Sequence, residues 1–295
     1  LRLLKEIPCA ELAAVAARTA ETLKQFSGEI PKSAAKTTDA ASIIKNPKID
    51  CVVIATPAAT HFKLAKEALE NGKHVLLEKP MVASLDEAKK LRALAAKSPS
   101  TFMVGHQYIY NDYVRYLHDN IVELGNVSHV IAEHLYNSPV REDIGCLWDA
   151  GTHQLAMIQY LFSPGKIISA TGRSVCMRNK DIDDFTAVAV KFEDGLAATI
   201  IVTWLSPRKT RKLTIIGSKK NAVLDDMEER DKLKLLDTQG SQPFTPKISA
   251  REPLRNEVEH FIRCIRTGEK PLTGIDSSYE IIEWLDKISR SVEKN

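Results

Sequence analysis

Short apolar runs rich in β-branched residues alternate with longer amphipathic stretches in the first part of the chain. Apolar residues recur at helical spacing over 62–70 and 85–96, and Ser84 and Glu87 have the spacing of a capping box before the second stretch. This alternation is typical of βαβ units. It predicts half of a dinucleotide-binding fold with a parallel sheet over residues 1–105. The strands are predicted at 51–55, 74–77 and 101–104, with a weaker one at 12–16.

The pattern changes after Gly105, where period-two alternation replaces the strand–helix rhythm. A helix is predicted at 114–124, and Glu193-Asp194-Gly195 is typical of a hairpin loop between two strands. Residues 106–295 are therefore predicted to form an α+β domain with a large, mainly antiparallel sheet, and its last helix to pack back on the first domain. The strands are predicted at 127–135, 185–192, 196–204 and 213–216, and the final helices at 254–267 and 277–289.

Composition and charge narrow the class of protein. The chain has 295 residues, enough for two domains, and its 41 basic and 38 acidic residues are spread along it, which excludes the basic stripe of a nucleic-acid binder. The five cysteines show no metal-ligand spacing, so we expect no metal and reduced thiols in the cytoplasm. No run reaches the roughly 20 apolar residues of a membrane span.

The glycine-rich turn that normally opens a dinucleotide-binding fold is absent from this sequence. Residues 1–6 resemble the second half of the helix that follows such a turn, so we expect a strand and the turn upstream; the alternative is a fold that never had them. Ala17 stands where an acidic ribose-binding residue is expected, followed by Arg18 and Thr19. This favours NADP over NAD, unless Arg18 is simply solvent-exposed.

Two motifs follow predicted strands, where the carboxyl ends of parallel strands form a ligand crevice. Ala55, Thr56 and Pro57 end the first of these strands and are candidate cofactor contacts. His61 follows them and is either a further contact or a packing histidine. Glu78-Lys79-Pro80 ends the next strand, which would direct Lys79 into the crevice.

The chain resembles the Gfo/Idh/MocA oxidoreductase family through the motif at 55–61 (ATPAATH), Glu78-Lys79-Pro80, and the motif at 149–153 (DAGTH). The resemblance implies a Rossmann-type domain that binds NAD or NADP, followed by a mainly antiparallel domain. It places Lys79, Asp149 and His153 around the nicotinamide and the reacting hydroxyl. It also places Gln107 beside the nicotinamide or the substrate.

The chemistry of alcohol oxidation agrees with these roles. His153 is suited to take the hydroxyl proton, and Lys79 to stabilise the developing alkoxide. Asp149 precedes His153 by one helical turn, so we expect the two to share a face and Asp149 to orient the imidazole. The alternative is that His153 is a packed core residue beside Met157 and Tyr160.

A narrower resemblance concerns the substrate. Segments 105–110, 141–143, 204–208 and 252–261 resemble the nucleotide-sugar branch of the family, which includes UDP-N-acetylglucosamine-type 3-dehydrogenases. Arg141 and Arg208 would then bind a diphosphate or a sugar carboxylate. The alternative is that each is a solvated or structural arginine. Two alternatives stay open: a simple sugar, inositol or dihydrodiol dehydrogenase, and a non-catalytic dinucleotide-binding regulator. We expect a homodimer or homotetramer.

Overall fold

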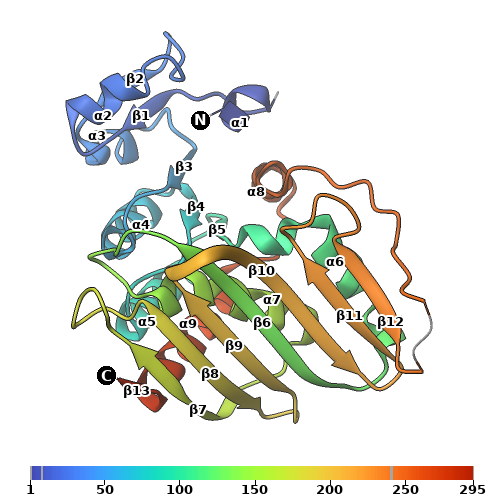
Figure 1. Ribbon diagram of the computed structural model, residues 1–295. Coiled ribbons are helices and arrows are strands. Elements are labelled where there is room, and N and C mark those ends of the chain that lie inside the picture. Colours follow the sequence, from blue (N-terminus) through green and yellow to red (C-terminus); the bar gives the residue numbers. More distant parts are fainter. Residues whose placement is uncertain (1, 8, 240–241, 295) are drawn as a thin grey trace.

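Short parallel strands separated by helices form the amino-terminal part of the molecule (Figure 1). The computed structural model describes residues 2–7, 9–239 and 242–294, so Leu1, the predicted start of the first helix, lies outside them. One parallel pair and one three-stranded parallel sheet are present in the described part of the chain. The pair is β1 (Ala14–Ala16) and β2 (Ala35–Thr37); the sheet is β3 (Cys51–Ile54), β4 (His74–Glu78) and β5 (Phe102–Gly105).

The helices between these strands begin at capping residues. Thr19 caps α2 by accepting a hydrogen bond from the Thr22 amide, and Ser84 caps α5 by accepting one from the Glu87 amide, as its capping-box position predicts. The parallel arrangement with intervening helices confirms the predicted Rossmann-type class. The helices are α1 (Arg2–Glu6), α2 (Ala20–Gln25), α3 (Ala40–Ile44), α4 (His61–Glu70) and α5 (Leu85–Ala95).

A large sheet dominates the rest of the molecule. Its strand order is β12-β11-β10-β6-β9-β8-β7-β13, and within the described residues all neighbours are antiparallel except β6–β9 and β7–β13. The predicted mainly antiparallel sheet is therefore confirmed. The strands are β6 (Val127–Asn137), β7 (Ile167–Val175), β8 (Phe185–Phe192), β9 (Ala197–Thr203), β10 (Leu205–Gly217), β11 (Lys220–Asp225), β12 (Leu233–Asp237) and β13 (Glu293–Lys294).

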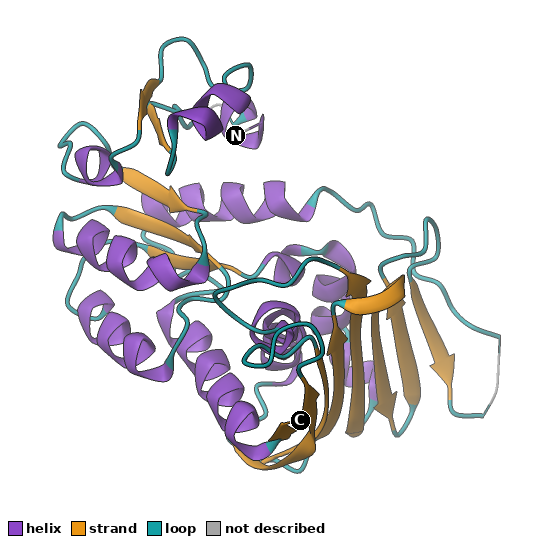
Figure 2. Ribbon diagram, turned by 60° about the vertical axis from the view of Figure 1, so that its left-hand side comes forward, coloured by secondary structure: helices purple, strands orange, loops and turns teal. Residues whose placement is uncertain are grey.

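Helices cover one face of this sheet (Figure 2). The apolar side chains of α7 (Thr152–Phe162) and α9 (Ile275–Ser291) join those of the inner sheet face in a continuous core. α9 also packs against α5, where Arg92 Nε donates to Asp276 Oδ1 at 2.7 Å. The other helices here are α6 (Asp112–Asp119) and α8 (Pro253–Thr267). No helix in the described ranges is both long enough and apolar enough to cross a membrane.

The predicted helix at 114–124 is wrong in its second half. α6 ends at Asp119, and residues Ile121–Leu124 form a separate 3₁₀ turn after Asn120. The backbone amide and the side-chain amide of Asn120 both donate to the Tyr116 carbonyl, at 3.1 Å and 2.8 Å, so Asn120 makes the last helical bond of α6 and caps its end. Strands β2, β7, β11, β12 and β13 were not predicted from the sequence.

Candidate active site

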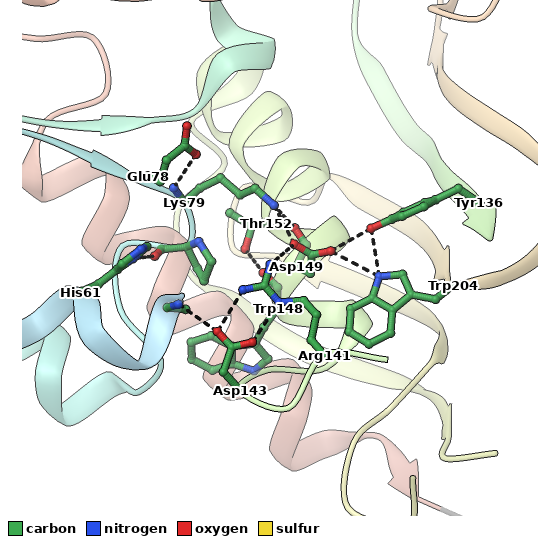
Figure 3. A network of polar contacts seen from close by, with 12 residues as sticks. His61, Glu78, Lys79, Tyr136, Arg141, Asp143, Trp148, Asp149, Thr152 and Trp204 are labelled. Carbon is green, nitrogen blue, oxygen red and sulfur yellow. Dashed lines mark hydrogen bonds and ion pairs between the residues drawn. The ribbon is translucent and has the colours of Figure 1, made fainter. Parts of the chain in front are cut away.

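Lys79 follows β4 and reaches from the parallel sheet to the second part of the molecule (Figure 3). Its Nζ donates to Asp149 Oδ1 at 2.7 Å and to the Asp149 carbonyl at 3.1 Å. The two side chains are only 16% and 10% exposed, so water screens this ion pair little. The structure thus brings together two of the three residues predicted to carry the chemistry.

Asp149 is the centre of a hydrogen-bond network. Its Oδ2 accepts from the Tyr136 hydroxyl at 2.7 Å and from the Trp204 indole at 3.2 Å (Figure 3). Burial opposes ionisation of the carboxyl, but the charge and hydrogen bond of Lys79 hold its pKa below the ordinary value. Asp149 is therefore an anchored carboxylate that fixes the position of the Lys79 ammonium.

Asp149 does not orient His153, contrary to the prediction from their spacing. Residues Leu147–Gly151 form a π-helical turn immediately before α7. Its wider winding breaks the four-residue repeat of an α-helix, which would have placed the two side chains on one face. None of the hydrogen bonds between described residues joins Asp149 to His153, and Asp149 faces Lys79 instead.

His153 lies in the first turn of α7, buried against two rings. Its centroid is 4.6 Å from that of Tyr108 and 5.7 Å from that of His134, and its Nδ1 is buried without a hydrogen-bond partner. Burial, reinforced by Lys79, lowers the pKa of His153 well below the ordinary histidine value. The sequence-based assumption of a near-neutral pKa is therefore wrong. The imidazole is neutral at neutral pH and can accept a proton.

A cavity of about 390 Å³ opens beside His153, which is the size of a small-molecule site. Its floor is the inner face of the large sheet, where His134 on β6 is paired with Arg211 on β10. Burial, followed by the charge of Arg211, lowers the pKa of His134 to about 3. The cavity is lined by Gln107, Tyr108, Asn111, His134, Tyr136, His153, Arg211, Asp226 and Pro253.

Sequence reasoning found Gln107 and His153 among these lining residues but missed Tyr108, His134, Tyr136 and Arg211. The two-residue spacing of His134 and Tyr136 was the available signal, because residues two apart in a strand face the same side, but the predicted strand at 127–135 ended one residue before Tyr136. The side that they face becomes known only from the pairing of β6 with β10.

The predicted cofactor contacts lie along the carboxyl ends of the parallel strands. Ala55, Thr56 and Pro57 are exposed after β3, and Arg18 is exposed near the end of β1. Exposed groups at this edge suit a dinucleotide. His106, just after β5, has both ring nitrogens buried and unpartnered, which leaves unmet hydrogen-bonding capacity on the same side as Lys79. The residues present therefore fit a nicotinamide dinucleotide.

His61 joins the two strand-end motifs. Its Nδ1 lies 2.9 Å from the Pro80 carbonyl oxygen and its Nε2 lies 2.8 Å from that of Thr56. The ring is almost completely buried. His61 thus connects the turn after β3 to the Glu78-Lys79-Pro80 turn and presents no free ring nitrogen.

The two arginines predicted to bind substrate have different surroundings. Arg141 forms a bidentate salt bridge with Asp143, in which Nε and Nη2 each donate a hydrogen bond of 2.9 Å. Its Nη1 lies 3.4 Å from Asp149 Oδ1. Asp143 in turn accepts from the Ala58 amide, so Arg141 ties the second part of the chain to the turn after β3. Arg208 is exposed on β10. Neither is among the residues that line the cavity.

Comparison with known families identifies the class of protein. Residues 1–106 match the family described as "Oxidoreductase family, NAD-binding Rossmann fold", and residues 122–223 match the "GFO/IDH/MocA C-terminal domain". The chain belongs to the GFO/IDH/MocA oxidoreductase family. Membership confirms NAD or NADP as the cofactor class.

Relatives within the family act on several kinds of alcohol. The chain is 29% identical to the 1-carboxy-3-chloro-3,4-dihydroxycyclohexa-1,5-diene dehydrogenase of Comamonas testosteroni over 61% of its own length and 48% of that protein. It thus spans about half of that relative. It is 25% identical to scyllo-inositol 2-dehydrogenase (NAD(+)) of Bacillus subtilis over 82% of its length and 75% of that protein.

A solved structure shares the whole fold. UDP-N-acetylglucosamine 3-dehydrogenase GnnA from Acidithiobacillus ferrooxidans superposes with a TM-score of 0.85 over 96% of this chain and 90% of that one. The sequence identity is 20%, so this likeness is evidence about the fold alone.

Proposed function

We propose that this protein is a nicotinamide-dependent dehydrogenase that acts on a secondary alcohol of a sugar or polyol. The observation that carries the proposal is the buried contact of 2.7 Å between Lys79 and Asp149, adjacent to a neutral His153 that borders the cavity. A purely structural ion pair would not need an unpartnered imidazole next to it. A non-catalytic regulator would have no use for either group.

Each residue has one task in the proposed reaction. A nicotinamide held at the carboxyl ends of the parallel strands, beside Lys79, would supply the acceptor for the hydride that leaves the carbinol carbon. The neutral His153 takes the hydroxyl proton, so that the alcohol becomes a ketone. The Lys79 ammonium, held by Asp149, stabilises negative charge on the reacting oxygen. Tyr136 and Trp204 fix Asp149 and thereby the direction of Lys79.

A nucleotide sugar is the substrate that we propose first. The family resemblance of segments 105–110 and 252–261 supports it, and the first of these contributes Gln107 and Tyr108 to the cavity wall. A free polyol or dihydrodiol is the second candidate, supported by the substrates in the names of the Bacillus and Comamonas relatives. The exposed Arg18 beside Ala17 supports NADP as the preferred cofactor.

The test is turnover followed by nicotinamide absorbance, with NAD and NADP against UDP-sugars, inositols and free sugars. His153→Asn should lower kcat by about 100-fold or more, because a positioned base contributes on that order. His118→Asn is the matched control, since His118 is exposed on α6 and stacks on Tyr160 away from the cavity. Unchanged turnover in His153→Asn would exclude the proposed mechanism.

A further inference from the structure

Arg211 carries a guanidinium with one buried N–H group that has no acceptor. That group is Nε, and no hydrogen bond from the Arg211 side chain occurs among the described residues, where its ion-pair contact is 3.8 Å long. A buried charged donor that makes no hydrogen bond costs free energy. Arg211 lines the cavity, so an acceptor bound there could meet this need.

The only carboxylate paired with Arg211 in the described ranges is shared with a second cation. Arg211 Nη1 lies 3.8 Å from Asp226 Oδ2, too far for a hydrogen bond, whereas Lys232 Nζ donates to Asp226 Oδ1 at 3.1 Å. Two cations thus share one anion. His134 and His153 add no charge at neutral pH, because burial lowers the pKa of both. The cavity therefore has an excess of positive charge at Arg211.

Tyr108 lies next to both Arg211 and the proposed base His153. The guanidinium lies 5.8 Å from the centre of the Tyr108 ring, and that ring lies 4.6 Å from the ring of His153. His134, the cross-strand partner of Arg211, has its own ring 5.7 Å from His153. A ligand in the cavity can therefore contact both Arg211 and His153, with Tyr108 and His134 beside it.

We propose that Arg211 binds an oxyanion substituent of the substrate, a phosphate or a carboxylate, on a different part of the sugar from the hydroxyl that reacts at His153. The inference rests on the proposed function and narrows its substrate class to anionic sugars. The planar guanidinium suits such a group because it can donate two parallel N–H bonds to the oxyanion. Asp226, whose Oδ2 lies 3.8 Å from Nη1, keeps the guanidinium beside the cavity without satisfying its donors.

Calorimetric binding separates this inference from catalysis. The probes are glucose, glucose 1-phosphate, glucuronate and UDP-glucose, titrated into the wild type, Arg211→Gln and Arg211→Lys. We expect at least one anionic probe to bind the wild type more tightly than glucose, and Arg211→Gln to weaken that probe by about 10-fold to 100-fold. Glucose affinity should not change. Arg211→Lys should bind the anionic probe more tightly than Arg211→Gln but less tightly than the wild type. Lysine keeps the positive charge but cannot donate two parallel N–H bonds.

Arg230→Gln is the matched control, because Arg230 is exposed in the turn before β12. Which probe responds distinguishes a phosphate, a carboxylate and a nucleotide diphosphate as the source of the anion. Equal affinity for neutral and anionic probes, no binding of any anionic probe, or an anion preference that survives in Arg211→Gln would each overturn the inference. An Arg211-dependent preference without turnover of any alcohol would instead refute the proposed function and leave the anion site standing.

Discussion

Glu78 and Glu257 face the same glycine. A Cβ built on Gly105 would lie 3.5 Å from Glu78 Oε2 and 3.4 Å from Glu257 Oε1. Glu257 is 1% exposed and its Oε2 has no hydrogen-bond partner. Burial, and then the nearby Glu78, raises the pKa of Glu257 well above the ordinary value, and burial raises that of Glu78. Glu257 therefore keeps its proton in the folded protein at a pH where it is ionised in the unfolded chain.

This difference makes stability depend on pH. The folded state binds more protons than the unfolded state above the ordinary glutamate pKa, so stability falls as pH rises through the window up to the raised value. Glu257→Gln cannot ionise, and we expect its melting temperature to fall less between about pH 5 and about pH 8, by a few degrees relative to the wild type. Scanning calorimetry at several pH values measures this.

Glu229→Gln is the matched control, because Glu229 is exposed. Its melting temperature should follow the wild-type pH profile. A Glu257→Gln profile that parallels the wild type would show that this carboxyl does not retain its proton on folding.

At the scale of elements, the π-helical turn that carries Asp149 depends on one preceding glycine. A Cβ on Gly145 would lie 1.8 Å from Asp183 Oδ1. Asp183 Oδ2 accepts hydrogen bonds from the Leu147 amide at 2.9 Å and from Cys146 Sγ at 3.2 Å. Gly145 therefore leaves room for the carboxylate that fixes the start of the turn.

Gly145→Ala should displace that carboxylate and leave its buried partners unsatisfied. We expect a loss of about 1–3 kcal/mol in the free energy of unfolding, and a lower kcat because Asp149 no longer holds Lys79. Urea unfolding and steady-state turnover measure the two effects. Gly28→Ala is the control, since a Cβ there meets no atom within 4 Å. A Gly145→Ala protein that unfolds at the wild-type urea concentration would contradict this account of the turn.

Buried apolar strands were predicted more completely than strands that carry polar residues. Strand β4 is apolar on both faces and was predicted almost to its ends, as parallel strands between helices usually are. Strand β10 begins with a polar segment that contains Pro207, so only its apolar last part was predicted. Strands β7 and β11 carry polar residues and lack a clear alternation of hydrophobicity.

The sequence predicted only those site residues that belong to short motifs. Lys79, Asp149 and His153 belong to motifs with fixed spacing, and the order of the motifs was enough to group them. Their geometry was not predictable, because a π-helical turn leaves no mark in the hydrophobic pattern. Arg211 was missed because its place in the cavity depends on the pairing of β10 with β6, which are distant in sequence.

At the scale of the whole molecule, the large sheet has one face covered by α7 and α9 and an opposite face that these helices do not cover (Figure 2). That opposite face carries the half-buried Ile131, Ile201 and Ile216 next to the polar Glu133 and Lys212. Apolar side chains with neighbouring charges of both signs suit a self-complementary contact between two copies. The homodimer or homotetramer stays a prediction, and this face is where we expect its contact.

Ile201→Glu should break this contact, because it places a carboxylate in the apolar centre of the face, directly opposite Glu133 in the sheet register. We expect light scattering to find a dimer or tetramer for the wild type and a smaller species for the variant, with unchanged far-ultraviolet circular dichroism. Val122→Glu is the control, since Val122 is 78% exposed in the 3₁₀ turn after α6, outside the sheet. A wild type that stays monomeric at high protein concentration would refute the assembly. An oligomer that persists in Ile201→Glu would place the interface elsewhere.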